Sequence, residues 1–428
     1  MKILNYNNEN FFNELKSHLL KRLSNTDNKI DNIVKNIILD VKENGDIALI
    51  KYAKNLDNVD LSQSDIKLRS INKLYSKDDI DDSVILSFKK AIKNIKKFHE
   101  NQIPQDYEMH NDDNVKLSLH WKPIESVGLY IPGGKAVYPS SLIMNVIPAK
   151  VAGVKRIVCV TPPSKKINPY ILKLLEELEI YEIYLVGGAQ AIAALTYGTK
   201  TIKPVNKIFG PGNAFVNSAK KQVFGNVGID LFAGPSEIVV VADDENNPSW
   251  IASDLMAQAE HDDSAQSILI TDSEEFVAKV RQEIKNLSYD LSKKNTIYNS
   301  LEINGLFIVI DNLKDSANIV NFIAPEHLHL QSKHKDEILA NIINSGSIFL
   351  GEYSCEAFGD YIVGTNHILP TSGSARFSSG LGVLDFMKRN TVIEMNKQSY
   401  NNCAKDVEQM AKVEGLDAHK LSVKIRQI

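Results

Sequence analysis

Asp254, Gln258 and His261 are of residue types that could hold a divalent cation. They lie at positions i, i+4 and i+7, and apolar residues recur at helical spacing from Pro248 onward, so a helix would turn all three to one side. Imidazole nitrogen and side-chain oxygen atoms are common metal ligands. An isolated histidine near a helix end is more often a cap. The spacing alone therefore leaves metal binding and capping open.

Two further pairs of residues carry acid/base groups. Glu326 and His327 stand side by side directly before an apolar run, where an acid/base pair could face a cleft. Glu414 and His419 lie near the carboxyl terminus. Histidines in a terminal segment ordinarily face solvent, so this second pair carries no chemistry by its spacing alone.

Residues 351–380 form a segment rich in glycine and serine that is too polar to be part of a core. Long polar segments in a compact protein are more often functional than idle. The side chains in it that could bind a ligand or exchange a proton are Glu356, Asp360, His367 and Arg376.

The elements that must position these residues follow from the spacing of apolar residues. From residue 127 onward, short apolar runs alternate with segments of helical period, which predicts a doubly wound, mostly parallel α/β sheet. Strands are expected at 127–131, 156–160, 182–186, 207–209, 238–242, 266–272, 306–311, 327–331 and 346–351. Helices are expected at 141–153, 168–178, 189–198, 213–225 and from residue 248 to about 261. Before them, residues 1 to about 105 are expected to be helical, with Gly45 closing one helix and with His99 and His110 exposed.

Glycine-bearing turns follow three of the expected strands, in the segments IPGGKAVYPSS, VGGAQA and FGPGNAF. At the carboxyl edge of a parallel sheet, the backbone N–H groups of such turns can bind the phosphates of a nucleotide. The spacing from Gly128 to Lys135 does not match a P-loop, and neither GGAQAI nor GPGNAF has the third glycine of GxGxxG. Nucleotide binding and tight strand-to-helix packing both remain open on the turns alone.

The composition restricts the class of protein. The chain has 428 residues, of which 43% are hydrophobic and 24% charged, which is enough for two or three globular domains. The net charge of -4 argues against nucleic-acid or polybasic membrane partners, and no apolar run is long enough for a membrane span. The amino terminus lacks the features of a secretory signal, so a cytoplasmic location is expected. Cys159, Cys355 and Cys403 are too far apart for a zinc-thiolate site, so any metal would need nitrogen and oxygen ligands.

Taken together, the motifs are specific where each alone is not. IPGGKAVYPSS, GGAQAIAALTYGT, GPGNAFV, IDLFAGPSE, SDLMAQAEHD, APEHL, GDYIVGTNHILPT and EGLDAHK occur in this order. With them the chain resembles the histidinol dehydrogenases over about residues 25 to 420. That family is homodimeric, binds zinc and oxidises L-histidinol to L-histidine with two NAD, in the last step of histidine biosynthesis.

The resemblance implies a role for each matching residue. The zinc ligands would be Gln258, His261, Asp360 and His419, with the last supplied by the partner subunit. The substrate contacts would be Ser236, Gln258, His261, His327, Asp360, Glu414 and His419. The NAD contacts would be Tyr130, Gln190 and Asn213.

The resemblance also implies the catalytic pair. His327 would be the general base that takes the alcohol proton, and Glu326 would activate water for the second oxidation. Cys355 stands where the family usually has proline, and the roles of Glu356 and His367 are left open, as a substrate contact, a residue that orients a ligand, or structural hydrogen bonding. Three alternatives remain: a zinc-dependent dehydrogenase of another small amino alcohol, a zinc hydrolase that uses Glu326, and a non-enzymatic nucleotide-binding scaffold.

The fold implied by the resemblance is α/β, with two incomplete Rossmann-like doubly wound sheets, a helical amino-terminal segment and an extended carboxyl-terminal dimerisation segment. Residues 26–106 and 237–380 would form the first domain and residues 129–235 the second. Residues 1–25 and 107–128 would form a small extension or linker, and residues 381–428 a tail that reaches the partner subunit.

Overall fold

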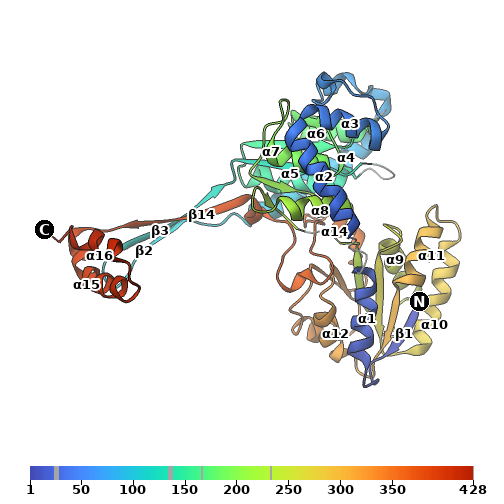
Figure 1. The fold of residues 1–428 in the computed structure, drawn as a ribbon. Coiled ribbons are helices and arrows are strands. Elements are labelled where there is room, and N and C mark those ends of the chain that lie inside the picture. Colours follow the sequence, from blue (N-terminus) through green and yellow to red (C-terminus); the bar gives the residue numbers. More distant parts are fainter. Residues whose placement is uncertain (24–27, 134–137, 165–166, 232–233, 428) are drawn as a thin grey trace.

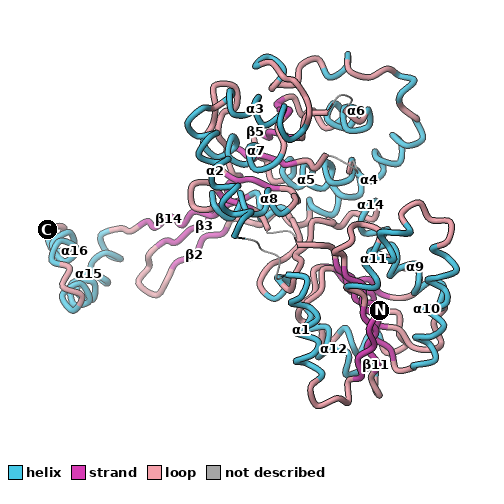
Figure 2. Tube along the Cα trace, turned by 45° about the vertical axis from the view of Figure 1, so that its right-hand side comes forward, coloured by secondary structure: helices cyan, strands magenta, loops and turns pink. Residues whose placement is uncertain are grey.

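The computed structural model describes residues 1–23, 28–133, 138–164, 167–231 and 234–427. Two bodies, each a parallel sheet between helices, lie one above the other in Figure 1, and a thin arm projects from the upper one. Figure 2 shows the strands of each body enclosed by their own helices. Part of the expected 131–141 turn, residues 134–137, lies outside the described residues.

The upper body is built on a five-stranded sheet in the order β6-β5-β4-β7-β8, in which all neighbouring strands are parallel. Its strands are β4 (Ser126–Tyr130), β5 (Arg156–Thr161), β6 (Glu182–Leu185), β7 (Lys207–Phe209) and β8 (Gly228–Ile229). Its helices are α2 (Asn28–Asn44), α3 (Asp46–Asp57), α4 (Asp82–Glu100), α5 (Pro139–Val151), α6 (Pro169–Glu177), α7 (Gly188–Tyr197) and α8 (Ala214–Val223). Because the chain passes from β4 to β6 and then returns to β7 on the other side of β4, the strand order reverses between β4 and β7.

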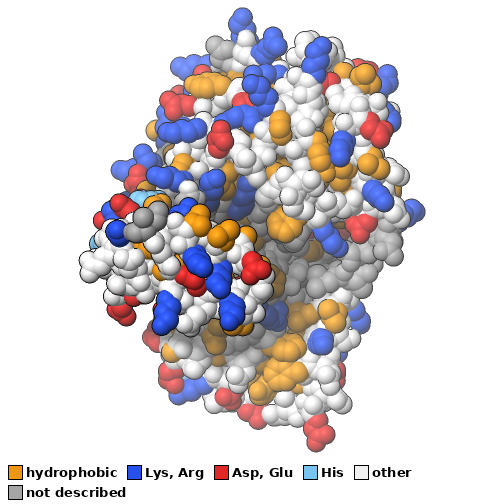
Figure 3. Space-filling model, turned by 60° about the vertical axis from the view of Figure 1, so that its left-hand side comes forward, with side chains coloured by type: hydrophobic (Ala, Val, Ile, Leu, Met, Phe, Trp, Pro, Cys, Tyr) orange, Lys and Arg blue, Asp and Glu red, His pale blue; other side chains and the backbone are white. Residues whose placement is uncertain are grey.

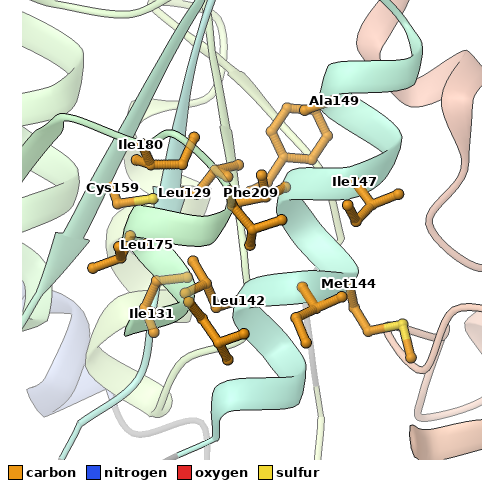
Figure 4. Packing of buried hydrophobic residues seen from close by; sticks show 14 of the residues in the cluster. Leu129, Ile131, Leu142, Met144, Ile147, Ala149, Cys159, Leu175, Ile180 and Phe209 are labelled. Atoms are coloured by element: carbon orange, nitrogen blue, oxygen red, sulfur yellow. The ribbon is translucent and has the colours of Figure 1, made fainter. Parts of the chain in front are cut away.

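Each face of this sheet has its own core. On one face, side chains of α5 and α6 such as Leu142 and Leu175 pack against Leu129, Cys159 and Phe209 of the strands (Figure 4). On the other face, α2, α3, α7 and α8 supply a second buried cluster. Full burial of an aliphatic side chain of this size stabilises a fold by about 1.5–3 kcal/mol. The sheet is thus buried on both faces, as parallel sheets require.

The lower body is built on a six-stranded parallel sheet in the order β1-β11-β10-β9-β12-β13. Its strands are β1 (Lys2–Asn5), β9 (Glu237–Val241), β10 (Gln266–Thr271), β11 (Leu306–Val309), β12 (His327–Leu330) and β13 (Ser347–Leu350). Its helices are α1 (Phe11–Leu23), α9 (Pro248–Ala259), α10 (Glu274–Ser288), α11 (Lys294–Ile303), α12 (Ser316–Ile323), α13 (Lys335–Leu339) and α14 (Glu356–Tyr361). Side chains alternate along β9, so Ile238 and Val240 pack against α9 and α10, whereas Val239 and Val241 belong to the core of the opposite face.

The arm is an antiparallel sheet in the order β14-β3-β2, followed by two helices. Its elements are β2 (Tyr107–His110), β3 (Lys116–Pro123), β14 (Met387–Glu394), α15 (Lys397–Val413) and α16 (Asp417–Lys424). The two helices lie at the tip of the arm, far from both parallel sheets (Figure 1). Short 3-10 helices elsewhere span Gln63–Asp65, Ile71–Lys73, Lys77–Asp79, Leu313–Asp315, Ser374–Arg376 and Val383–Phe386. In the described part of the chain, no helix is both long enough and apolar enough to cross a membrane.

The expected alternation of strands and helices is confirmed, and Gly45 has a φ of 52° directly after α2, as a residue that closes a helix should. The expected division into domains is wrong at the amino terminus. Residues 26–106 pack on the five-stranded sheet through α2, α3 and α4, while residues 1–25 join the six-stranded sheet through β1. Both assignments depend on long-range packing, which local spacing does not report.

The expected exposure of His99 is also wrong, whereas that of His110 is confirmed. His99 is fully buried, and its Nδ1 donates to the carbonyl oxygen of Ile95 at 2.8 Å. One turn of helix separates the two residues, so α4 satisfies Nδ1 of the imidazole internally while its apolar stripe packs on α5.

Candidate active site

The expected acid/base pair lies at the amino edge of the six-stranded sheet, at the start of β12. Strands β9 and β12 are parallel neighbours, and the Cα atom of His327 pairs with that of Ile238. This register places Glu326 beside Glu237, whose backbone N–H donates to Glu326 Oε2 at 2.9 Å. The carboxylate of Glu326 is thereby held next to the imidazole, with Oε2 3.7 Å from Nδ1 of His327.

His327 is held as a neutral base. Its Nδ1 lies 3.0 Å from the carbonyl oxygen of Glu237, which can only accept a hydrogen bond, so Nδ1 carries the hydrogen and Nε2 the lone pair. Nε2 is buried and has no hydrogen-bond partner among the described residues. Burial lowers the pKa of His327 to about 3, and the nearby His261 and His367 act in the same direction. The ring is therefore neutral at physiological pH, with a free lone pair.

A cluster of possible metal ligands lies beside this imidazole. Single ligand atoms of His261, Glu356 and Asp360 all lie within 4.8 Å of one another, and Asp360 Oδ1 is 3.8 Å from Nε2 of His327. His261 follows the end of α9, and the two carboxylates come from α14. Helix α9 follows β9 and runs back along the sheet, which brings its carboxyl end to the same edge as the start of β12.

Without a cation nearby, the ionised forms of the carboxylates in the cluster are disfavoured. Burial raises the pKa of Asp360 to about 7, and burial together with the charges of Asp360, Glu326 and Asp254 raises the pKa of Glu356. A divalent cation would relieve both effects, because it replaces lost water and offsets the repulsion between carboxylates. The donors are nitrogen and oxygen atoms, so the site fits zinc, which takes imidazole and carboxylate ligands without requiring cysteine.

Gln258 lies on the last turn of α9 and is buried in the same cluster. Its amide has hydrogen-bond partners only when the nitrogen faces Glu356, at 2.8 Å from Oε1, and the carbonyl oxygen of Glu237, at 3.2 Å. The carboxylate of Glu356 and the Glu237 carbonyl therefore orient the amide of Gln258. With its nitrogen so engaged, the amide oxygen of Gln258 is the atom left to bind a cation.

The two bodies meet at His367. Its Nδ1 donates to the carbonyl oxygen of Asp360 at 2.9 Å, and its Nε2 lies 3.2 Å from Oγ of Ser141, in the first turn of α5. Next to it, the side-chain amide of Asn366 donates to the carbonyl oxygen of Met144 at 2.7 Å. The amino edge of the lower sheet is thus joined to the carboxyl edge of the upper one.

Some expected residues lie elsewhere. Asp254 turns away from the cluster toward His329 and Gln331, and Arg376 binds backbone carbonyl groups. Ser236 directly precedes Glu237 and is half-buried at the same edge of the sheet. Glu414 and His419 are exposed at the tip of the arm, so a single chain does not bring them to the other expected ligands (Figure 1).

The expected NAD contacts lie at the carboxyl edge of the upper sheet. Tyr130 ends β4, and its hydroxyl accepts a hydrogen bond from Gly188 N, 3.1 Å away, at the start of α7. A Cβ on Gly210 would lie 2.2 Å from the carbonyl oxygen of Tyr130, so only glycine allows the turn after β7 to approach β4 this closely. Gln190 is buried, and its side-chain oxygen has no hydrogen-bond partner in the part of the chain that the structure describes. The side-chain oxygen of Asn213 caps α8.

These groups fit a dinucleotide. The turns meet where the strand order reverses between β4 and β7, which is where open α/β sheets bind their ligands. A buried ion pair that the sequence did not reveal supports the turn after β7: Lys220 Nζ lies 2.6 Å from Asp230 Oδ1, and Asp230 Oδ2 accepts from Gly210 N at 2.7 Å. No spacing signal could have found this pair, since it depends on the return of the chain in β8.

A dinucleotide-type sheet that faces a buried glutamate–histidine pair and a cluster of nitrogen and oxygen ligands defines an α/β oxidoreductase. The chain belongs to the histidinol dehydrogenase family, because the family model described as "Histidinol dehydrogenase" matches residues 20–427. It is 47% identical over 406 residues to the histidinol dehydrogenase of Rhodospirillum rubrum, covering 93% of this chain and 92% of that protein. It is 45% identical over 420 residues to that of Clostridium acetobutylicum, covering 98% and 96%.

The fold agrees with this assignment. The crystal structure of histidinol dehydrogenase from Elizabethkingia anophelis superposes with a TM-score of 0.93 at 37% sequence identity, covering 100% of this chain and 98% of that one. The resemblance seen in the sequence motifs is confirmed.

Proposed function

We propose that the chain oxidises L-histidinol to L-histidine in two steps, through L-histidinaldehyde that stays bound, with one NAD reduced in each step. Membership of the family supports this substrate and favours it over another amino alcohol or over a hydrolase. The observation that carries the mechanism is the neutral, buried His327, whose free Nε2 lies 3.8 Å from Asp360 and whose neighbour is Glu326.

In the first step His327 Nε2 accepts the proton of the alcohol while a hydride leaves carbon for NAD. The hydrogen bond from Nδ1 to the Glu237 carbonyl keeps the lone pair on Nε2 and stabilises the ring as it becomes protonated. The low pKa of the ring makes the proton easy to pass on, so the base is ready for a second use.

In the second step Glu326 removes a proton from water as the water attacks the aldehyde carbon. The resulting hydrate loses its hydride to a second NAD, and its hydroxyl proton passes to His327. The products are a carboxylate and NADH. The backbone N–H of Glu237 holds one carboxylate oxygen of Glu326 in place.

Gln258, His261 and Asp360 would hold a zinc ion, together with His419 of the partner subunit. When bound, zinc would supply a fixed positive centre that orients the imidazole and amino nitrogens of the substrate, and this tether keeps the aldehyde in place between the two oxidations. Glu356 orients Gln258, which explains why a carboxylate that is not itself in the ligand set is buried there. Ser236 of the same chain would complete the substrate contacts, together with Glu414 of the partner subunit.

A homodimer explains why the arm projects. Val413 at the end of α15 is 88% exposed, Met410 65% and Ile393 on β14 66%, which is unusual for apolar residues on an isolated surface. Hydrophobic side chains lie among charged ones on the face that includes the projecting arm (Figure 3). An arm packed on a second copy would bury these residues and carry Glu414 and His419 to the other body.

The test is to mix the full-length protein with L-histidinol and excess NAD, and to count NADH and histidine with and without a chelator. Two NADH per histidine, lost on chelation and restored by zinc, is the expected result. Product without NAD would indicate a hydrolase. No NADH from the zinc-loaded dimer would overturn the proposal, and one NADH per substrate would mean that the aldehyde escapes.

A further inference from the structure

One acidic side chain outside the proposed catalytic pair is incompletely hydrogen-bonded. Asp57 is the last residue of α3, and its Oδ2 is buried without a hydrogen-bond partner among the described residues. Burial raises its pKa to about 6. A buried carboxylate oxygen that nothing satisfies lowers the stability of a fold, so its position calls for a ligand that supplies the missing hydrogen bonds.

The course of α3 places Asp57 at the edge of the upper sheet where NAD is expected. At the start of the helix, the carboxylate of Asp46 accepts hydrogen bonds from Thr201, and Gly45 faces Thr199, just beyond the end of α7. Helix α3 packs on α7. Nine residues after Asp57, the carbonyl oxygen of Ile66 accepts a hydrogen bond from the backbone N–H of Leu185, at the carboxyl end of β6, at 2.8 Å. The end of α3 therefore leads to the carboxyl edge of the five-stranded sheet.

The carboxyl edge to which α3 leads also carries the groups of the proposed cofactor site. The charge of Asp57 adds to the burial that raises the pKa of the Tyr130 phenol. Tyr130 in turn accepts the hydrogen bond from Gly188. Gln190 folds back over Gly188, and its buried side-chain oxygen also lacks a hydrogen-bond partner within the described ranges. Two buried oxygen atoms, one of a carboxylate and one of an amide, thus lack a hydrogen-bond partner among the described residues.

Resting on the proposed function, we propose that Asp57 accepts hydrogen bonds from the vicinal ribose hydroxyls of NAD and selects against dinucleotides that carry a 2′-phosphate. Hydroxyl groups are the donors that an orphaned carboxylate lacks, and a carboxylate is the group that dinucleotide-binding sheets use to bind ribose hydroxyls. In a complete Rossmann motif this carboxylate follows the glycine-rich turn, but neither GGAQAI nor GPGNAF belongs to such a motif. Here the carboxylate would come from α3, which precedes the sheet in the chain.

Selectivity follows from charge. A 2′-phosphate replaces a hydrogen-bond donor with a group that only accepts and is negatively charged, so it would meet a second negative charge at Asp57. Repulsion between the 2′-phosphate and the carboxylate would therefore weaken the binding of NADP relative to that of NAD. Gln190 is neutral and does not distinguish the two dinucleotides in this way.

The experiment is calorimetric titration of the zinc-loaded, full-length protein with NAD and with NADP, in the absence of histidinol. The variant Asp57→Asn is expected to bind NAD about 10-fold more weakly or worse, because charge-assisted hydrogen bonds are lost. Its preference for NAD over NADP is expected to shrink by a similar factor. The matched control is Asp60→Asn, which makes the same charge change three residues later on a side chain that is 83% exposed, and it should leave both affinities unchanged.

Unchanged NAD affinity in Asp57→Asn would overturn the inference. An equal loss of affinity for NAD and for NADP would also overturn it, because it would indicate a change in the shape of the binding site. Misfolding is excluded by the melting temperature of the metal-loaded variant, which should equal or exceed that of the wild type. Failure of the proposed function looks different: the wild-type protein would then bind NAD and yet form no NADH from histidinol.

Discussion

The Nδ1 atom of His327 lies 3.0 Å from the backbone carbonyl oxygen of Glu237, on the neighbouring strand of the sheet. One main-chain acceptor thereby decides which ring nitrogen is the base. The same residue orients Glu326, since its N–H donates to the carboxylate. Both side chains that we propose to be catalytic are thus positioned by the start of β9, a rigid element, rather than by a loop.

Glu326→Gln should separate the two oxidations. The amide cannot take a proton from water, so aldehyde oxidation should fall by about 10²–10⁴-fold, while the first NADH still forms. His327→Asn should lose both steps. Stopped-flow measurement of NADH with histidinol and, separately, with histidinaldehyde checks this, with His334→Gln as the control because it lies outside the site. Equal loss of both steps in Glu326→Gln would contradict the assignment.

Glu356→Gln should weaken zinc binding without removing a ligand. The amide of Gln258 would lose the carboxylate that fixes its orientation, and the loss of such an orienting group typically costs 10–100-fold in metal affinity. Competition with a chromophoric chelator measures the affinity. The control is Glu352→Gln, an exposed carboxylate on the preceding loop. If zinc affinity is unchanged in Glu356→Gln, the orientation of Gln258 does not depend on Glu356.

The shared site can be tested by mixing inactive variants. His261→Asn and His419→Asn should each be inactive alone. After subunit exchange, about a quarter of wild-type activity should return, because half of randomly paired dimers are mixed and each of these has one intact site of two. Each variant mixed with itself is the control. No recovery despite mass-spectrometric proof of mixed dimers would place both histidines in one subunit's site.

The buried pair Lys220 and Asp230 should be costly to break. Lys220→Met leaves a buried carboxylate alone and should lower the free energy of unfolding by about 3–5 kcal/mol, whereas Lys220→Met with Asp230→Leu should cost less. Urea unfolding of the metal-free protein measures both. Lys221→Met, the exposed neighbour, should have little effect. A double variant less stable than the single one would show that the attraction between Lys220 and Asp230 exceeds the free-energy cost of burying both charges.

The pH dependence of stability should reveal Asp57. Its pKa of about 6 in the folded chain lies above the ordinary value of about 3.9 in an unfolded one, so the folded chain binds more protons between these values. The wild type should therefore lose stability relative to Asp57→Asn as the pH rises from about 4 to 6, and then run parallel to it. Urea unfolding of the cofactor-free proteins across this range, with Asp60→Asn as the control, checks the sign. Parallel curves from pH 4 upward would contradict the raised pKa.

Local spacing was sufficient for the strands and helices. The alternation of apolar runs with helical segments predicted β4 to β7, β9 to β13 and α5 to α9, because the side-chain periods of strands and helices are local properties. The two-residue strand β8 was not predicted, since it is too short to have a period. The motifs were sufficient for the family and for naming Glu326, His327, Gln258, His261 and Asp360 as a set. These residues do gather at one edge of one sheet.

The rest depended on contacts between distant parts of the chain. Only packing decided that α2 to α4 cover the upper sheet while β1 completes the lower one, and that His99 and the Oδ2 atom of Asp57 are buried. The tautomer of His327 and the orientation of Gln258 likewise depend on partners many residues away. Sequence spacing determines which residues share a face of one element, whereas the free energy of burial decides which faces meet, and that is a property of the whole chain.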